Sequence, residues 1–188
     1  SKDTPRIQEM HILPLVELFN GLLYVLIVTK CGFCVDSILY CLCASVLIVI
    51  SLIDAKTYEI PLGCNVLIAA FGIARLFLHF DRWYEYAGGA VVVSGFFLLA
   101  YLVTKGRGIG GGDIKLMAAA GLFLGFGKIL VAAGIGSILG AVIHLTLMKL
   151  CGKDRVLPFG PYLSAGILIS MLWGDGIIRW YLQFCGLA

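Results

Sequence analysis

The chain has 188 residues, of which 61% are apolar and 13% carry charge, and its mean hydropathy is +1.01. This apolar content exceeds what a single soluble core requires and indicates a protein that crosses the membrane several times. The net charge of +3 is small and spread over the loops, which excludes a nucleic-acid partner. A secretory signal peptide does not explain the pattern, because no single apolar segment dominates.

Recurrent apolar stretches predict an all-α fold, a polytopic membrane helix bundle of about seven (six to eight) membrane segments. We expect one membrane-embedded domain over residues 1–188, with a cytoplasmic lead-in at 1–12 and an interfacial amphipathic tail at 175–188. The fifth and seventh segments are short for a perpendicular crossing, so we expect them to be tilted, partly buried or re-entrant. The expected segments are Leu13–Thr29, Ser37–Ile53, Pro61–Leu78, Tyr86–Thr104, Ile114–Phe126, Ile129–Met148 and Tyr162–Trp173.

The basic residues predict how the chain is oriented in the membrane. With the N-terminus in the cytoplasm, nine basic residues lie on the inner side and four on the outer side, as the positive-inside rule requires. The second and fourth segments then both run inward, so Asp54 and Asp113 arrive at the same cytoplasmic face. The inner residues are Lys2, Arg6, Lys56, Lys105, Arg107, Lys115, Lys149, Lys153 and Arg155, and the outer ones are Lys30, Arg82, Lys128 and Arg179.

Asp54 and Asp113 are the foremost candidates for chemistry. Asp54 ends a long apolar run, and Asp113 lies between a glycine tract and the next apolar segment. A carboxylate at the edge of hydrocarbon is costly without a partner or a watery cavity, so it is a functional candidate by default. Two such groups on one face can share a proton and carry out acid and base chemistry on one water molecule.

Gly110, Gly111 and Gly112 directly precede Asp113. Glycines here permit backbone angles that other residues avoid, and they leave room for another backbone to lie alongside. Open peptide groups in such a tract could hydrogen-bond an extended substrate strand. The alternative is an ordinary interhelical loop, in which glycine ends one helix and Asp113 caps the next.

Four segments of the chain, in family order, resemble the type IV prepilin peptidases, which are membrane aspartyl proteases of the GxGD type. Gly110–Asp113 matches the GxGD element, and Asp54 followed by Ile60–Pro61 is similar to the family's first catalytic aspartate segment. The remaining two similar segments are Pro14–Tyr24 and Leu157–Tyr162. GxGD alone is a weak signal, whereas the four segments together are specific.

The resemblance implies an aspartic endopeptidase of the bacterial cytoplasmic (inner) membrane, a multi-pass protein whose active site faces the cytoplasm. Its substrates would be prepilin-like or pseudopilin precursors, cut after a glycine that follows a short basic leader. Such precursors supply type IV pili, type II secretion or DNA-uptake filaments. The implied catalytic pair is Asp54 and Asp113, with Gly110, Gly111 and Gly112 as the active-site loop and no metal. The implied partners are the precursor proteins and the lipid bilayer.

Bifunctional members of that family also methylate the new N-terminus with S-adenosylmethionine, and they carry a cysteine-containing segment before the element similar to Pro14–Tyr24. No cysteine precedes Pro14 here, so we expect peptidase activity alone, with no cofactor. S-adenosylmethionine would be used only if the chain, which begins at Ser1, is trimmed from a bifunctional protein.

Two other functions are alternatives for the buried aspartates. A proton-coupled transporter would also bury carboxylates, but its site would lie near the midplane of the membrane. A membrane scaffold would tolerate loss of either aspartate.

Three other features have mainly structural interpretations. Lys115 could lower the pKa of one aspartate, but an interfacial anchor is the favoured role. Arg75, in the third segment, is expected to extend its guanidinium to the outer interface and to have no function. Cys31 and Cys34 form a lone CxxC without a second pair at zinc-site spacing, so we expect no metal.

Overall fold

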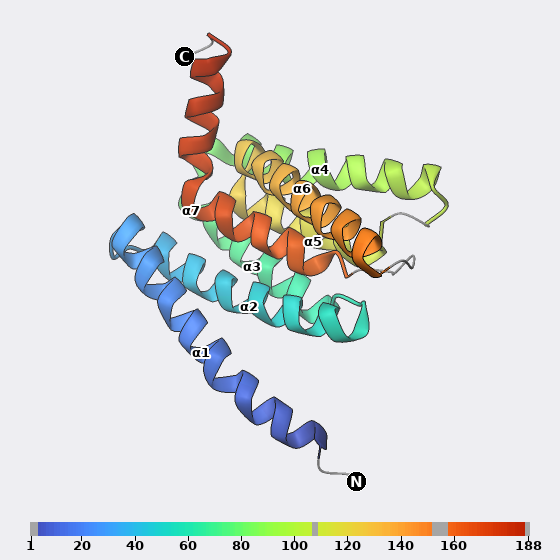
Figure 1. Cartoon of the computed structure of the whole chain (residues 1–188). Helices are drawn as coiled ribbons and strands as arrows, with labels where there is room; N and C mark the ends of the chain where they lie inside the picture. The colour runs from blue at the N-terminus through green and yellow to red at the C-terminus, as the bar shows by residue number, and fades with distance from the viewer. Residues whose placement is uncertain (1–3, 107–108, 152–157, 187–188) are drawn as a thin grey trace.

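The computed structural model describes residues 4–106, 109–151 and 158–186. This part of the chain folds into seven α-helices and one short 3-10 helix and contains no strand, which confirms the predicted all-α polytopic bundle (Figure 1). The elements are α1 (Thr4–Cys31), α2 (Val35–Thr57), α3 (Leu62–Leu78), η1 (Phe80–Arg82), α4 (Trp83–Val103), α5 (Gly111–Leu124), α6 (Phe126–Cys151) and α7 (Gly160–Phe184).

Within the described residues, five stretches are long and apolar enough to cross a membrane: Leu13–Cys31, Val35–Thr57, Phe80–Val103, Phe126–Leu150 and Gly160–Phe184. Helix α3 is a shorter apolar helix of 17 residues, and α5 has 14. The fifth predicted segment is therefore short, as expected, because about 20 residues are needed for a perpendicular crossing.

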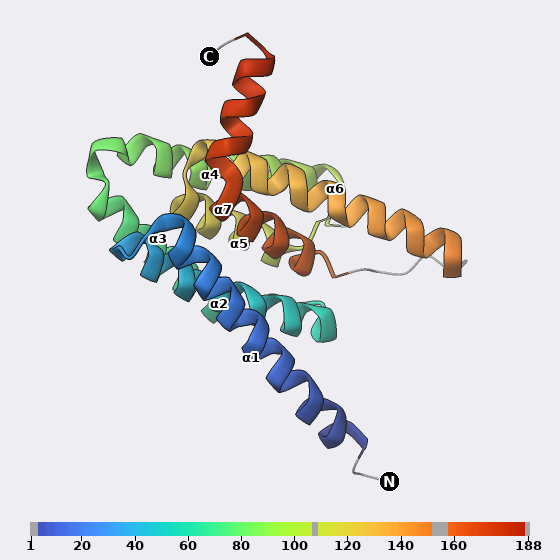
Figure 2. The same cartoon turned by 60° about the vertical axis from the view of Figure 1, so that its left-hand side comes forward.

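The seventh segment is longer than the sequence predicted. Instead of Tyr162–Trp173 followed by a separate tail, one helix runs from Gly160 to Phe184. Gly174 and Gly176 lower helix propensity but keep their N–H groups, so they do not end the helix. Figures 1 and 2 show α7 changing direction before its last part, which projects away from the bundle. Whether that part lies at the membrane interface stays a prediction.

Helix α5 lies at the centre of the bundle, where it packs against α3, α4, α6 and α7. Leu116, Met117, Ala120 and Phe123 have no exposed surface. A helix that is apolar on all sides is typical of such a position, because every face meets another helix. The bundle therefore holds the residue at the start of this helix, Asp113, in a fixed place.

Glycine allows the helices around α5 to approach closely. A Cβ atom on Gly89 of α4 would lie 2.5 Å from the carbonyl oxygen of Gly121 in α5. A Cβ on Gly72 of α3 would lie 2.9 Å from the backbone of Leu122. Larger residues at these positions would force the helices apart, which is the reason small residues are enriched at helix contacts within membranes.

Helix α1 packs along α2 and diverges from the other helices toward its N-terminus (Figures 1 and 2). Helix α2 in turn packs against α3 and α7. Asp36 and Asp54 lie near its two ends, about 27 Å apart along the helix axis. Because this length is close to the thickness of the hydrocarbon core, the two aspartates belong to opposite ends of the bundle.

Candidate active site

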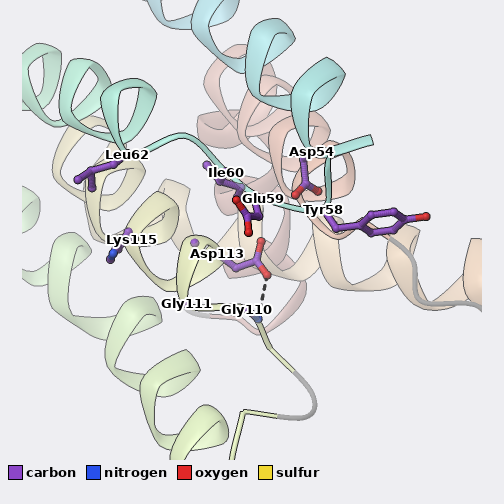
Figure 3. A pocket seen from close by; sticks show the side chains of 10 residues that line it. Asp54, Tyr58, Glu59, Ile60, Leu62, Gly110, Gly111, Asp113 and Lys115 are labelled. Carbon is purple, nitrogen blue, oxygen red and sulfur yellow. Dashed lines mark hydrogen bonds between the residues drawn. The ribbon is translucent and has the colours of Figure 1, made fainter. Parts of the chain in front are cut away.

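Asp54 and Asp113, which are distant in sequence, line the same pocket. The pocket has a volume of about 270 Å³ and lies between the end of α2, the segment that leads into α3 and the start of α5. Figure 3 shows the two carboxylates directed into the shared space, Asp54 from α2 and Asp113 from α5. The residues that line the pocket are Asp54, Tyr58, Glu59, Ile60, Leu62, Gly110, Gly111, Gly112, Asp113 and Lys115.

Asp54 lies in the last turn of α2 and is only 4% exposed. Its Oδ2 accepts a hydrogen bond of 2.9 Å from the backbone N–H of Gly160, the first residue of α7. The helix ends shortly afterwards, because Tyr58 adopts a left-handed conformation with φ 58° and donates its N–H to the Asp54 carbonyl. A non-glycine residue in this conformation is strained, and such residues cluster at functional sites.

Asp113 is the third residue of α5 and is 8% exposed. Its Oδ2 accepts a hydrogen bond of 3.2 Å from the Gly110 N–H, as an acidic residue does when it caps a helix from this position. Asp113 precedes the apolar part of α5. Burial is the main cause that raises the pKa of Asp113 to about 6; the Gly110 N–H lowers it and the charge of Asp54 raises it. A carboxyl with this pKa can hold a proton near neutral pH.

Of the two sequence interpretations of the glycine tract, the structure agrees with the one in which Asp113 caps the next helix, and it does not show unusual backbone angles at Gly110. Gly111 and Gly112 form the first turn of α5, and Gly110 precedes it with φ −76° and ψ 146°. These are angles that any residue adopts, so conformational freedom is not what these positions need. Space is needed instead at Gly112, where a Cβ would lie 3.1 Å from the Ile60 Cβ. The first-turn N–H groups of a helix have no intrahelical acceptor, so hydrogen-bond donors remain available at the pocket.

Three pocket residues carry polar groups that sequence reasoning left out or left open. Tyr58 and Glu59 are exposed and were not predicted, although their place four and five residues after Asp54 was a usable signal. Lys115 is also exposed, and Figure 3 shows its amine pointing away from the Asp113 carboxylate. No ion pair links Lys115 to either aspartate within the described residues. This geometry favours the anchoring role.

Gly160 lies in the segment Leu157–Tyr162 that resembles the family, but the sequence interpretation gave it no role in the site. A Cβ at this position would lie 2.7 Å from Asp54 Oδ2, so only glycine lets the backbone approach the carboxylate. The available signal was Pro158-Phe159-Gly160-Pro161, in which a proline at the second position of α7 favours a helix start.

Arg75 contradicts the expectation of an extended side chain at the interface. Its side chain is buried, and Nε donates to Asp36 Oδ1 at 2.8 Å. Its Nη1 donates to the carbonyl oxygen of Phe123 at 2.6 Å, and His79 Nε2 lies 2.8 Å from Asp36 Oδ2. The prediction failed because hydropathy does not reveal that Asp36, from another helix, is close enough to pair with Arg75. This cluster lies at the end of the bundle opposite Asp54.

Clusters of three or more His, Cys, Asp or Glu side chains that could hold a metal ion are absent from the part of the chain that the structure describes. The fold and the pocket define a class of protein, a polytopic helical membrane protein with two buried carboxylates at one end of its bundle.

Residues 41–145 match the model of the type IV leader peptidase family, and the chain belongs to that family. The matched region contains both Asp54 and Asp113. The resemblance found from the sequence segments is thereby confirmed. No solved structure matches the chain.

Curated relatives agree with the family assignment. A prepilin leader peptidase/N-methyltransferase of Legionella pneumophila is 33% identical over 91% of this chain and 62% of its own length. A protein of the same name from Bacillus subtilis (strain 168) is 34% identical over 90% of this chain and 69% of its own length. A third protein of that name, from Pseudomonas aeruginosa, is 33% identical over 92% of this chain and 62% of its own length. The chain thus spans about two thirds of the length of these relatives.

Proposed function

We propose that this chain is a membrane aspartic endopeptidase that cleaves the basic leader from type IV prepilin-like precursors on the cytoplasmic side of a bacterial inner membrane. The observation that carries the proposal is the meeting of Asp54 and Asp113 in one pocket at one end of the bundle. Membership of the type IV leader peptidase family supports leader cleavage as the reaction. Pili, type II secretion and DNA-uptake filaments are equally compatible destinations for the product.

Peptide hydrolysis would use the two carboxyl groups in opposite protonation states. One is ionised and takes a proton from water, and the other is protonated and polarises the scissile carbonyl before serving the leaving amine. The raised pKa of Asp113 supports the presence of a proton in the pair. The Gly160 and Gly110 N–H groups hold the carboxylates in place. No covalent intermediate is needed.

The pocket also has features that suit a peptide substrate. It is open to the surface at the end of the apolar bundle, so a basic leader can reach it from water while an apolar substrate helix stays in the bilayer. Glu59 adds negative charge to the lining, which favours a basic leader. First-turn N–H groups at Gly111 and Gly112 can donate to substrate carbonyl groups.

Replacement of each aspartate by asparagine tests the proposal. Asparagine has nearly the same shape but cannot cycle a proton, so Asp54→Asn and Asp113→Asn should each abolish cleavage of a prepilin-like substrate in liposomes. Folding and binding of the uncut precursor should persist, because asparagine keeps the shape of the side chain and the other residues that line the pocket are unchanged. Asp81→Asn, at an exposed position at the opposite end of the bundle, is the matched control and should cleave at the parent rate. Cleavage by either asparagine variant at a rate near the parent's would refute the two-aspartate mechanism.

The names of the relatives also include N-methyltransferase. Peptidase activity without methylation stays our prediction for this chain. It is tested by mixing the purified chain with cleaved pilin and labelled S-adenosylmethionine, and transfer of label to the pilin would show it to be wrong.

A further inference from the structure

A second pocket lies at the end of the bundle opposite Asp54 and has no part in the proposed peptidase reaction. Its volume is about 410 Å³, larger than that of the aspartate pocket. The end of α1, the start of α2, and parts of α3, α6 and α7 surround it. It is therefore a surface pocket lined by five helices, as a binding site between helices is.

The charged residues that line this pocket have an excess of positive charge. Four are basic and two are acidic, which gives a net charge of +2 (4 − 2). Two ion pairs account for part of the set: Arg75 Nε lies 2.8 Å from Asp36 Oδ1, and Lys128 Nζ lies 2.8 Å from Asp175 Oδ2. The charged residues of the lining are Lys30, Asp36, Arg75, Lys128, Asp175 and Arg179.

Lys30 and Arg179 are the two basic residues of the lining that take part in neither of these ion pairs. The Lys30 ammonium lies 4.1 Å from the centre of the Trp173 ring, and Arg179 Nε donates to the backbone carbonyl of Asp175 at 3.3 Å. Neither side chain forms an ion pair with a carboxylate among residues 4–106, 109–151 and 158–186. The pocket thus holds two cations whose charge is not balanced by the protein, and this points to an anionic ligand.

The depth of the pocket in the membrane indicates the source of the anion. Lys30 lies at the end of the stretch Leu13–Cys31, and Asp36 at the start of Val35–Thr57, so the pocket is level with the ends of two candidate spans. Trp173 is 44% exposed there, and tryptophan is enriched at the level of the lipid headgroups. Met171 and Leu172 add an apolar part to the lining. A group with a negative charge and an adjoining apolar chain fits these surroundings.

We propose that this pocket binds a phosphate group, with Lys30 and Arg179 as its direct ligands and with Arg75 and Lys128 adding positive charge. Basic pockets between membrane helices can bind anionic lipid headgroups through their Lys and Arg side chains. The phosphate could be carried by an anionic phospholipid or be free in solution, and the chemistry of recognition is the same. The site is separate from the aspartate pocket, since Asp36 in its lining is about 27 Å from Asp54 along α2 and the two pockets share no lining residue.

Native mass spectrometry of the purified protein tests the proposal with three probes: phosphatidylglycerol, phosphatidylcholine and inorganic phosphate. We expect the parent to retain phosphatidylglycerol in preference to phosphatidylcholine. The double variant Lys30→Gln/Arg179→Gln should bind it about thirtyfold more weakly, because each basic residue near an anionic lipid contributes about fivefold. Binding of inorganic phosphate that is also lost in the double variant would identify the free anion as a ligand, and binding of phosphatidylglycerol alone would identify the lipid.

Arg82→Gln is the matched control, since Arg82 is a basic residue at the same end of the bundle, exposed and outside the pocket. It should leave binding unchanged. A second measurement needs no substitution at the site: phosphatidylglycerol should slow the reaction of Cys31 and Cys34, which line the pocket, with a charged thiol reagent, but not that of the exposed Cys185. Equal retention of both lipids without phosphate binding, or unchanged binding in the double variant together with unprotected thiols, would overturn the proposal.

Discussion

The backbone N–H of Gly160 donates a hydrogen bond of 2.9 Å to Oδ2 of Asp54, a residue that precedes it by 106 positions. The bond joins the start of α7 to the end of α2 and fixes the orientation of one carboxylate of the pocket. A charged acceptor strengthens such a bond, and the positive end of the α7 dipole faces this carboxylate. Gly160 therefore positions the Asp54 carboxylate.

Gly160→Ala should greatly reduce cleavage. The added Cβ would lie 2.7 Å from Asp54 Oδ2, so the carboxylate or the start of α7 must move. A misplacement of about 1 Å at a catalytic group costs about a hundredfold in rate, and we expect a loss of that size in kcat. Steady-state cleavage of a prepilin-like peptide in liposomes measures it.

The control for this substitution is Gly176→Ala in the same helix. Nothing lies within 4 Å of a Cβ at Gly176, so cleavage should be unchanged and α7 should be slightly more stable, by about 0.5–1 kcal/mol. Equal activity of the two variants would show that Gly160 has no positioning role.

The space around the glycine tract leads us to expect that alanine at Gly111 and alanine at Gly112 change the stability of the protein differently. Gly112→Ala places a Cβ 3.1 Å from that of Ile60 and should lower the free energy of unfolding by about 1–2 kcal/mol, because the packed neighbour must move. Gly111→Ala places a Cβ in open space and should leave stability unchanged or raise it by about 0.5–1 kcal/mol. Thermal unfolding in detergent compares them. The reverse order would contradict the packing argument.

From the raised pKa of Asp113 we expect the stability of the folded chain to depend on pH. Its pKa in the folded chain, about 6, is above the ordinary value of 3.8, so the folded state binds more protons than the unfolded state between these values. Stability from this group is therefore highest below pH 3.8 and falls as the pH rises through about 6, by about 3 kcal/mol in all. Asp113→Asn removes the effect, so the variant should gain stability over the parent as the pH rises from about 4 to about 7.

Thermal unfolding of both proteins across this pH range provides the measurement. Other carboxyl groups titrate in the same range, so the difference between variant and parent at each pH is the relevant quantity. A difference that does not change with pH would show that the pKa of Asp113 is not raised.

Much of the fold could be predicted because a membrane helix follows from local composition. The apolar runs located every helix of the bundle, and the distribution of basic residues was enough to assign Asp54 and Asp113 to the same end of it. The pairing of particular residues across helices could not be predicted in this way. Neither the Gly160–Asp54 bond nor the Arg75–Asp36 pair leaves a periodic signal, because each depends on which helix faces which. The glycine tract left two interpretations open, and only the structure shows that Gly111 and Gly112 belong to a helix whose start Asp113 caps.

The ion pair of Arg75 and Asp36 leads to the last prediction, which separates stability from activity. Arg75 is 7% exposed, and its guanidinium lies 4.8 Å from the ring centre of Tyr40 and 5.2 Å from that of Phe123. Asp36→Asn would leave this buried charge without a carboxylate partner. We expect the free energy of unfolding to fall by about 2–3 kcal/mol, somewhat less than for a fully buried pair, because the Asp36 side chain is 29% exposed.

Cleavage per folded molecule should nevertheless stay at the parent rate in Asp36→Asn, because the pair lies at the opposite end of α2 from Asp54. Asp81→Asn is the matched control; its partner Arg82 is exposed, and exposed pairs contribute at most about 1 kcal/mol.

The double variant Asp36→Asn/Arg75→Met removes both charges and should recover part of the lost stability, since an unpaired buried charge costs more than the loss of the pair. Chemical unfolding in detergent and cleavage at a temperature where every variant is folded measure the two quantities. A double variant less stable than Asp36→Asn would show that contacts of Arg75 other than its ion pair contribute more to stability than the pair does. Reduced cleavage by the folded Asp36→Asn protein would show that the two ends of the bundle are coupled.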